Sequence, residues 1–156
     1  MGVAERTRLE VEVFKALRAP VPPGFFRRVL ERSARVPEVE ARLPGGIATL
    51  ALRLTSDEEL RRLNRDFANQ DSVTDVLSFA GSQQHVGDLA ISWPMAVRQA
   101  AEFGHDEQTE VGVLSVHGLL HLLGWDHVTA AERKEMTRLT IAALALSGLT
   151  PAAGRL

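Results

Sequence analysis

The chain has 156 residues, of which 45% are hydrophobic and 24% are charged, and its formal net charge is −2. This balance is typical of one folded domain and excludes both a disordered chain and an overall basic field. The absence of cysteine excludes disulfide partners and thiolate metal sites. No apolar stretch approaches the roughly 18 residues of a membrane span, and segment 1–10 is charged where a signal peptide is apolar. We therefore expect a cytoplasmic protein without membrane contact.

The first half of the sequence alternates between strand and helix patterns. Residues 9–13 alternate apolar and charged side chains, as a half-buried strand does, and residues 47–54 show a similar alternation after two glycines. Between them, a proline pair opens a predicted helix at 22–36. Ser56 and Glu59 form a predicted capping box at the start of another amphipathic helix.

The second half of the sequence contains more helix than strand. In chain order, its patterns predict two short strands and three helices at 74–79, 86–92, 93–103, 107–123 and 130–148. The turn between the two strands indicates a hairpin or an adjacent pair. Together the elements predict an α+β fold: a single domain over residues 1–156, with a small mixed sheet of about four strands covered by about five helices.

Three histidines, His117, His121 and His127, lie close together in the sequence. On a helix, residues i and i+4 have Cβ atoms about 5–6 Å apart, so the first two imidazoles can bind one ion. Gly124 should end the helix, because glycine adopts the left-handed conformation without steric cost. The turn then returns His127 toward the pair. This predicts three nitrogen ligands with one position left for water, as in catalytic zinc sites.

A hydrogen-bonded core residue is the commoner explanation of a single histidine on an apolar helix. Here, however, the segment 113–123 is apolar around both imidazoles. Two unpartnered imidazoles are costly to bury in such surroundings. The pattern therefore favours a metal site over core packing.

The spacing His-x3-His-x2-Gly-x2-His is also that of the metzincin proteases, in which a glutamate after the first histidine is the general base. Here that position is Gly118, so the usual peptide hydrolysis has no proton acceptor. We expect a hydrolase of another substrate class. A metalloprotease-like hydrolase stays an alternative if another carboxylate replaces the glutamate.

Further motifs accompany the histidine block at 117–127: Leu63-Asn64, Thr-Asp-Val-Leu-Ser-Phe at 74–79, Gly-Asp-Leu-Ala-Ile-Ser at 87–92, and Met136. From about Leu63 onward the sequence resembles the YbeY-type endoribonucleases, or rRNA maturation factors. The resemblance implies an α+β fold, one Zn²⁺ per chain bound by the three histidines, and cleavage of single-stranded RNA. It also implies maturation of the 16S rRNA 3′ end on the small ribosomal subunit, in ribosome biogenesis and quality control.

One departure from the family pattern concerns substrate binding. Ala68 stands where the family has an arginine five residues after the leucine of its Leu-Asn motif. Arg61, Arg62 and Arg65 lie on the same predicted helix and are our candidates for RNA contact, although a solvated face paired with acidic neighbours explains them too. The departure keeps a second hypothesis open, a metal-bound ribosome-assembly factor with little nuclease activity.

The remaining candidates each allow two or more roles. Asp126 is our candidate catalytic residue, either as a proton acceptor or by orienting a ligand imidazole, and a turn-capping role is the alternative. Asp75 either lines the cleft or binds turn amides. Trp125 either stacks on a base or packs in the core. His85 and His105 are expected in surface loops.

Overall fold

The sheet has four strands in the order β1-β2-β4-β3. We describe residues 7–68, 70 and 74–156 of a computed structural model. The strands are β1 (Arg8–Lys15), β2 (Ile47–Thr55), β3 (Val76–Ala80) and β4 (His85–Ser92). β1 and β4 both run parallel to β2, whereas β3 is an antiparallel edge strand on β4, so the expected mixed sheet is confirmed.

Six helices lie within the described residues, one more than the sequence predicts: α1 (Pro23–Ser33), α2 (Pro37–Arg42), α3 (Asp57–Ala68), α4 (Trp93–Phe103), α5 (Glu107–Leu122) and α6 (Ala130–Ala145). The additional helix is α2. The helix predicted at 22–36 ends at Ser33, three residues earlier than expected. α2 follows as a separate helix, because the residue before a proline is driven out of the helical region. Val36, which precedes Pro37, is extended at ψ 123° and caps α2.

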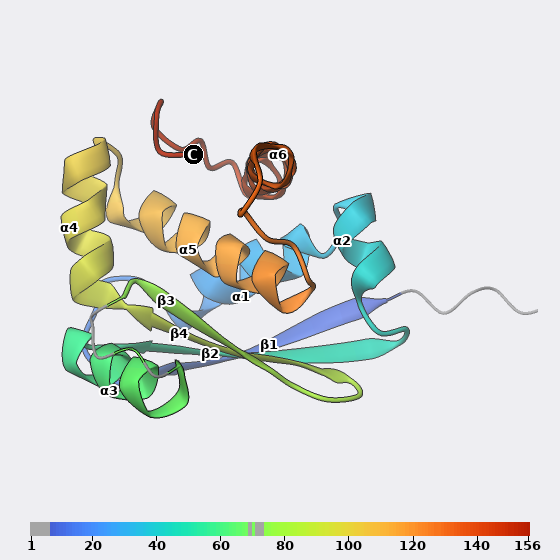
Figure 1. Ribbon diagram of the computed structural model, residues 1–156, viewed down its shortest axis with the longest axis horizontal. Coiled ribbons are helices and arrows are strands. Elements are labelled where there is room, and N and C mark those ends of the chain that lie inside the picture. The colour runs from blue at the N-terminus through green and yellow to red at the C-terminus, as the bar shows by residue number, and fades with distance from the viewer. Residues whose placement is uncertain (1–6, 69, 71–73) are drawn as a thin grey trace, which may run out of the picture.

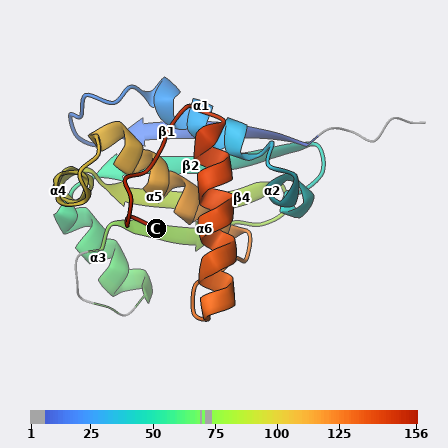
Figure 2. The same cartoon turned by 90° about the horizontal axis from the view of Figure 1, so that it is seen from above.

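Helices α1, α2, α4, α5 and α6 lie on one face of the sheet (Figure 1). α1 and α5 lie next to the strands, and α6 crosses α5 on the side away from the sheet (Figures 1 and 2). β2 supplies the sheet side of this core, because its alternate residues Leu50, Leu52 and Leu54 are almost fully buried. α3 lies at one end of the sheet, apart from α6 in both views.

α5 is the central helix of the domain. Its N-terminus is capped by Asp106, whose carboxylate accepts a hydrogen bond from the backbone of Thr109 at 2.7 Å. Most of its residues from Thr109 to Leu120 are buried, with His117 partly open. Among the described residues, no helix combines the length and apolarity needed to cross a membrane.

Candidate active site

The C-terminal end of α5 turns sharply at Gly124, as the sequence predicts. Gly124 is left-handed at φ 96°, its amide donates to the carbonyl of His121 at 3.0 Å, and the amide of Trp125 donates to Leu120 at 3.0 Å. These two bonds form a Schellman motif, which reverses the chain at a helix end. The reversal brings the rings of His121 and His127 into edge-to-face contact, with centroids 5.0 Å apart.

All three predicted histidines line one cavity of about 590 Å³. Its walls come from the start of β3, from α5, from the loop after α5, from α6 and from the C-terminal segment 155–156. The lining residues other than the histidines are Thr74, Asp75, Val76, Ser78, Arg133, Lys134, Met136, Thr137, Arg155 and Leu156. A volume of this size accommodates a small organic ligand or part of a polymer chain.

The first two histidines are kept neutral by their surroundings. Burial is the main reason that the pKa of His117 is lowered to about 4; the Arg155 charge also lowers it, and the Glu110 charge opposes this effect. Burial also lowers the pKa of His121, followed by repulsion from His127. A neutral imidazole is the form that binds metals, so both side chains have the right protonation state for ligands at neutral pH.

The three imidazoles are not placed as ligands of a single metal ion in this structure. Over residues 7–68, 70 and 74–156, no three histidine or carboxylate side chains are placed so that they could hold an ion together. The donor chemistry nevertheless suits zinc: the three imidazoles face the same cavity, and the ring nitrogens of His117 make no hydrogen bond with any described residue. Side-chain rotations between staggered positions are therefore what a three-histidine site requires.

Gly118 faces the sheet and not the cavity. A Cβ built at this position lies 2.6 Å from Cδ2 of Leu89, a β4 side chain that is itself buried. The carbonyl of Gly118 accepts a hydrogen bond from the hydroxyl of Ser78 on β3 at 3.3 Å. α5 therefore packs so closely on the sheet that a side chain at the position of the metzincin glutamate would have to displace the buried Leu89.

The residues beside His127 have local structural partners. The carboxylate of Asp126 is exposed and accepts a hydrogen bond from the backbone of His127 at 2.7 Å. This contact is of the turn-capping kind, and the cavity lining does not include Asp126. Trp125 is buried, and the guanidinium of Arg42 lies 3.7 Å from its ring centroid. Trp125 is thus a packing residue, one of the two roles that the sequence allows.

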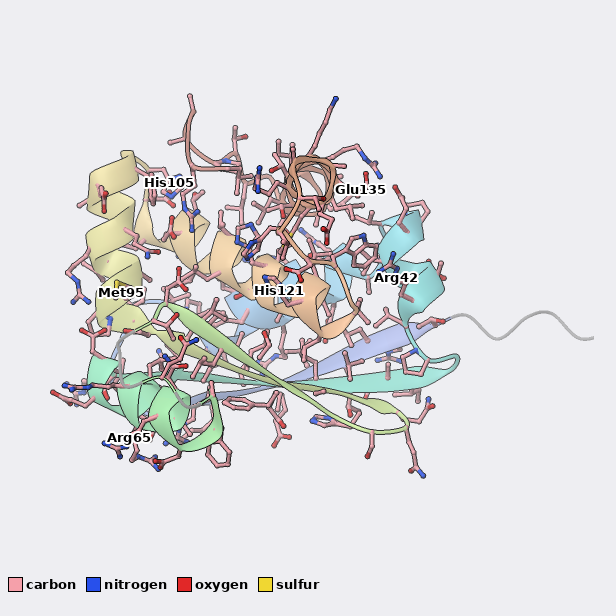
Figure 3. All side chains as sticks on the ribbon, in the orientation of Figure 1. Arg42, Arg65, Met95, His105, His121 and Glu135 are labelled. Atoms are coloured by element: carbon pink, nitrogen blue, oxygen red, sulfur yellow. The ribbon has the colours of Figure 1, made fainter. Side chains whose placement is uncertain are left out.

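The predicted RNA-binding arginines on α3 do not reach this cavity. Neither Arg61, Arg62 nor Arg65 lines it, and Arg65 points away from His121 (Figure 3). Arg62 pairs with Glu59 at 3.3 Å and Arg65 with Asp66 at 3.2 Å. Two of the three positive charges are therefore balanced by neighbouring carboxylates at an exposed surface.

The cationic residues of the cavity are ones that the motif analysis did not single out. Arg133 and Lys134 come from α6, and Arg155 comes from the C-terminal segment. Asp75 supplies the facing carboxylate: one oxygen accepts from the amide of Val76 at 2.8 Å and the other from Gln99 at 3.3 Å. Asp75 thus fulfils both roles expected of it, since it lines the cavity and also binds a backbone amide.

A buried ionic cluster fixes the C-terminal segment to α5. Glu110 is fully buried, and both its oxygens accept hydrogen bonds from Arg155, the shortest at 2.7 Å. His105 donates from Nε2 to the same carboxylate at 2.7 Å, because its Nδ1 accepts from the amide of Ala152. The surface role expected for His105 is therefore wrong. Its side chain is only 7% exposed.

The other histidine expected in a surface loop lies in a strand. His85 begins β4, and its ring nitrogens bond to Thr49 at 2.7 Å and to Asp88 at 3.1 Å. Its side chain keeps 38% exposure, so it is a surface residue but not a loop residue.

Comparison with known proteins places this geometry in a family. A family model described as endoribonuclease YbeY matches residues 23–147. The chain belongs to the YbeY family. It is 34% identical over 154 residues to an endoribonuclease YbeY of Roseiflexus castenholzii, covering 89% of this chain and 94% of the relative. It is 50% identical over 93 residues to that of Gloeobacter violaceus, covering 53% of this chain and about half, 48%, of the relative.

The fold also resembles a solved structure. A Thermotoga maritima protein determined in solution superposes with a TM-score of 0.58 at 20% identity, over 86% of this chain and 89% of that one. The YbeY family match ends at residue 147, before the segment that carries Arg155. The cavity therefore combines family-matched walls with one wall from beyond the matched region.

Proposed function

We propose that this protein is a zinc-dependent endoribonuclease that cuts single-stranded RNA. The observation that carries the proposal is the cavity lined by His117, His121 and His127, in a chain of the YbeY family. The low pKa of His117, caused by burial, supports its role as a neutral ligand. A zinc ion bound by the three imidazoles would polarise the scissile phosphate, activate a water or the RNA 2′-hydroxyl, or do both.

The chain's own residues have three roles in this proposal. The histidines hold one zinc ion per chain, Asp126 accepts a proton or orients a ligand imidazole, and basic residues bind the RNA backbone. Arg61, Arg62 and Arg65 stay candidates for contacts with RNA outside the cavity. The cellular role we propose is maturation of the 16S rRNA 3′ end on the small ribosomal subunit, in ribosome biogenesis and quality control in the cytoplasm.

The alternative functions differ in the chemical groups that they require in the cavity. A metalloprotease-like hydrolase needs a base near the first histidine, and the packing of Gly118 on Leu89 argues against one from position 118. A metal-bound assembly factor with little nuclease activity needs the zinc but not the RNA cleavage. Substrate choice and metal dependence therefore separate the three possibilities.

The test combines metal analysis with cleavage assays. Protein purified without added metal should contain close to one zinc per chain, and it should cut a labelled single-stranded RNA but neither a hairpin stem nor casein. A chelator should abolish cleavage. His117→Ala should lose both zinc and cleavage, whereas His85→Ala, a histidine of β4 outside the cavity, should keep both.

Three results would contradict parts of this proposal. Full zinc content in His117→Ala would remove the three-histidine site. Zinc binding without RNA cleavage would favour the assembly factor. Chelator-sensitive digestion of casein would favour a protease.

A further inference from the structure

Among the described residues, the cavity is lined by one lysine and two arginines, and their charges are not equally available. Arg155 is committed to the fully buried Glu110 by three hydrogen bonds, and its side chain is only 11% exposed. A buried guanidinium paired in this way adds little net positive charge to the cavity, because the carboxylate lies within contact distance. Arg155 is therefore a poor candidate for holding an additional anion.

Arg133, in contrast, is bound only to neutral groups among the described residues. Its Nη1 donates to the carbonyl oxygens of Val128 at 3.0 Å and His127 at 3.4 Å, which are neutral acceptors. These bonds tie the side chain to the loop that carries His127, at the wall of the cavity. The guanidinium is thus positioned beside the histidines, and no carboxylate among the described residues pairs with it.

Lys134, the next residue on α6, also lines the cavity and is exposed. It forms no ion pair with any residue that the structure describes. One turn further along the helix, Arg138 has the opposite character. It pairs with Glu135 at 2.7 Å and also with Glu38. Available positive charge on this helix is therefore confined to the part that borders the cavity.

The carboxylate of Asp75 lies on the other wall, where β3 begins. The two walls of the cavity therefore carry opposite charges, positive on the α6 wall and negative on the β3 wall. A polyanion entering the cavity is attracted to α6 and repelled from the start of β3. This arrangement selects a path for the chain of phosphates along α6.

We infer that Arg133 and Lys134 bind backbone phosphates of a single RNA strand and hold it along α6, beside the three histidines. The inference rests on the proposed function, because it supplies the substrate contacts of that same cavity. It assigns the main phosphate contacts to α6, and it leaves the α3 arginines at most an outlying part of the strand. Arg133 has a second role in this arrangement, since it links the bound phosphate to the loop of His127.

The test measures how RNA binding depends on salt. A fluorescein-labelled single-stranded 2′-O-methyl oligonucleotide is titrated with the zinc-loaded protein at several salt concentrations, and its integrity is checked on a gel. Each phosphate contact to a single strand contributes about 0.7 to the slope of log K against log salt. Arg133→Gln combined with Lys134→Gln should therefore reduce the slope by about 1.4, and Lys134→Gln alone by about 0.7.

Arg138→Gln is the matched control, because it removes the same charge from the same helix at a position already neutralised. Its slope should equal that of the unaltered protein. Zinc content and thermal unfolding are measured for every variant, so that a release of the His127 loop in Arg133→Gln is recognised. Lys134 has no such partner within residues 7–68, 70 and 74–156, and its single variant isolates the phosphate contact.

The possible failures are distinguishable. An unchanged slope in the double variant, or an equal loss in Arg138→Gln, overturns the α6 assignment while RNA cleavage by the unaltered protein leaves the proposed function intact. If the slopes change as expected but the protein cuts no RNA, the phosphate contacts of Arg133 and Lys134 are supported and the nuclease assignment is overturned. A protein that neither binds nor cuts single-stranded RNA overturns both.

Discussion

The helices α3 and α6 each carry three basic residues in a short span, and they differ in what surrounds those residues. On α3, Arg62 and Arg65 pair with Glu59 and Asp66 and lie away from the histidines. On α6, Arg133 and Lys134 border the histidine cavity without carboxylate partners among the described residues. Exposed ion pairs contribute little to stability, and their charges are screened by salt. The difference teaches that the fold, and not the number of arginines on a helix, determines which basic residues can serve the cavity.

The largest effect should come from Asp126, the candidate catalytic residue next to His127. If Asp126 accepts a proton, Asp126→Asn should lower RNA turnover by about 10²–10⁴-fold with zinc retained. If it orients a ligand imidazole, zinc affinity should instead fall by roughly 10–100-fold. Single-turnover cleavage and competitive metal titration measure the two quantities.

Asp66→Asn is the control for this substitution, because Asp66 is an exposed carboxylate whose described partner is Arg65 on α3. It should change neither turnover nor zinc affinity. Normal values of both in Asp126→Asn would leave Asp126 only its hydrogen bond to the amide of His127.

A smaller effect, on stability, should separate the buried pair of the cavity from the surface pairs of α3. Glu110→Gln leaves the guanidinium of Arg155 without its compensating charge in a site where Glu110 is 0% exposed. Loss of one partner of a buried pair costs about 3–5 kcal/mol, and we expect about 3 because Arg155 lies close to the chain end. Urea unfolding measures the difference.

The surface pair of Arg65 and Asp66 provides the comparison. Asp66→Asn should change the free energy of unfolding by less than about 1 kcal/mol. Equal losses in the two variants would mean that the cluster around Glu110 is no more important for stability than an exposed pair.

The smallest effect should come from α3 itself. Replacing Arg62 and Arg65 by glutamine should change RNA affinity by less than about threefold at physiological salt, because both charges are exposed and already paired.

Ala68→Arg adds an unpaired charge at an exposed position of the same helix and should raise cleavage without changing zinc content. Titration of the labelled oligonucleotide and zinc analysis measure these outcomes. A larger loss from α3 than from α6 would reverse the assignment of the phosphate contacts.

Elements with strong local signals were predictable from the sequence. α4 begins and ends where expected, because Ser92 caps its start at 3.2 Å from the amide of Met95 and Gly104 is left-handed at φ 82°. The capping box at α3 is only half correct. Ser56 does accept from the amide of Glu59, but the Glu59 carboxylate pairs with Arg53 on β2. A partner on a neighbouring strand competes with the local one, and local sequence does not reveal it.

The candidate site divides in the same way. The histidines share one cavity because a single helix and its glycine turn bring them together, and that information is local. The walls that face them come from β3, from α6 and from the C-terminal segment. Arg155 forms an ion pair with Glu110, which lies 45 residues earlier in the sequence, and the same cluster buries His105. No spacing rule links such residues, so only the packed fold reveals them.

The attachment of the C-terminal segment has a consequence for how the cavity opens. One ionic cluster, together with the contact of Arg155 with Phe103, ties residues 152–155 to the body of the domain. Local unfolding of such a segment has a lower free energy than global unfolding, because it leaves the sheet and its helices intact. One wall of the cavity can thus be released independently of the rest. The amide of Ala152, which bonds to His105, becomes open to hydrogen exchange whenever that release occurs.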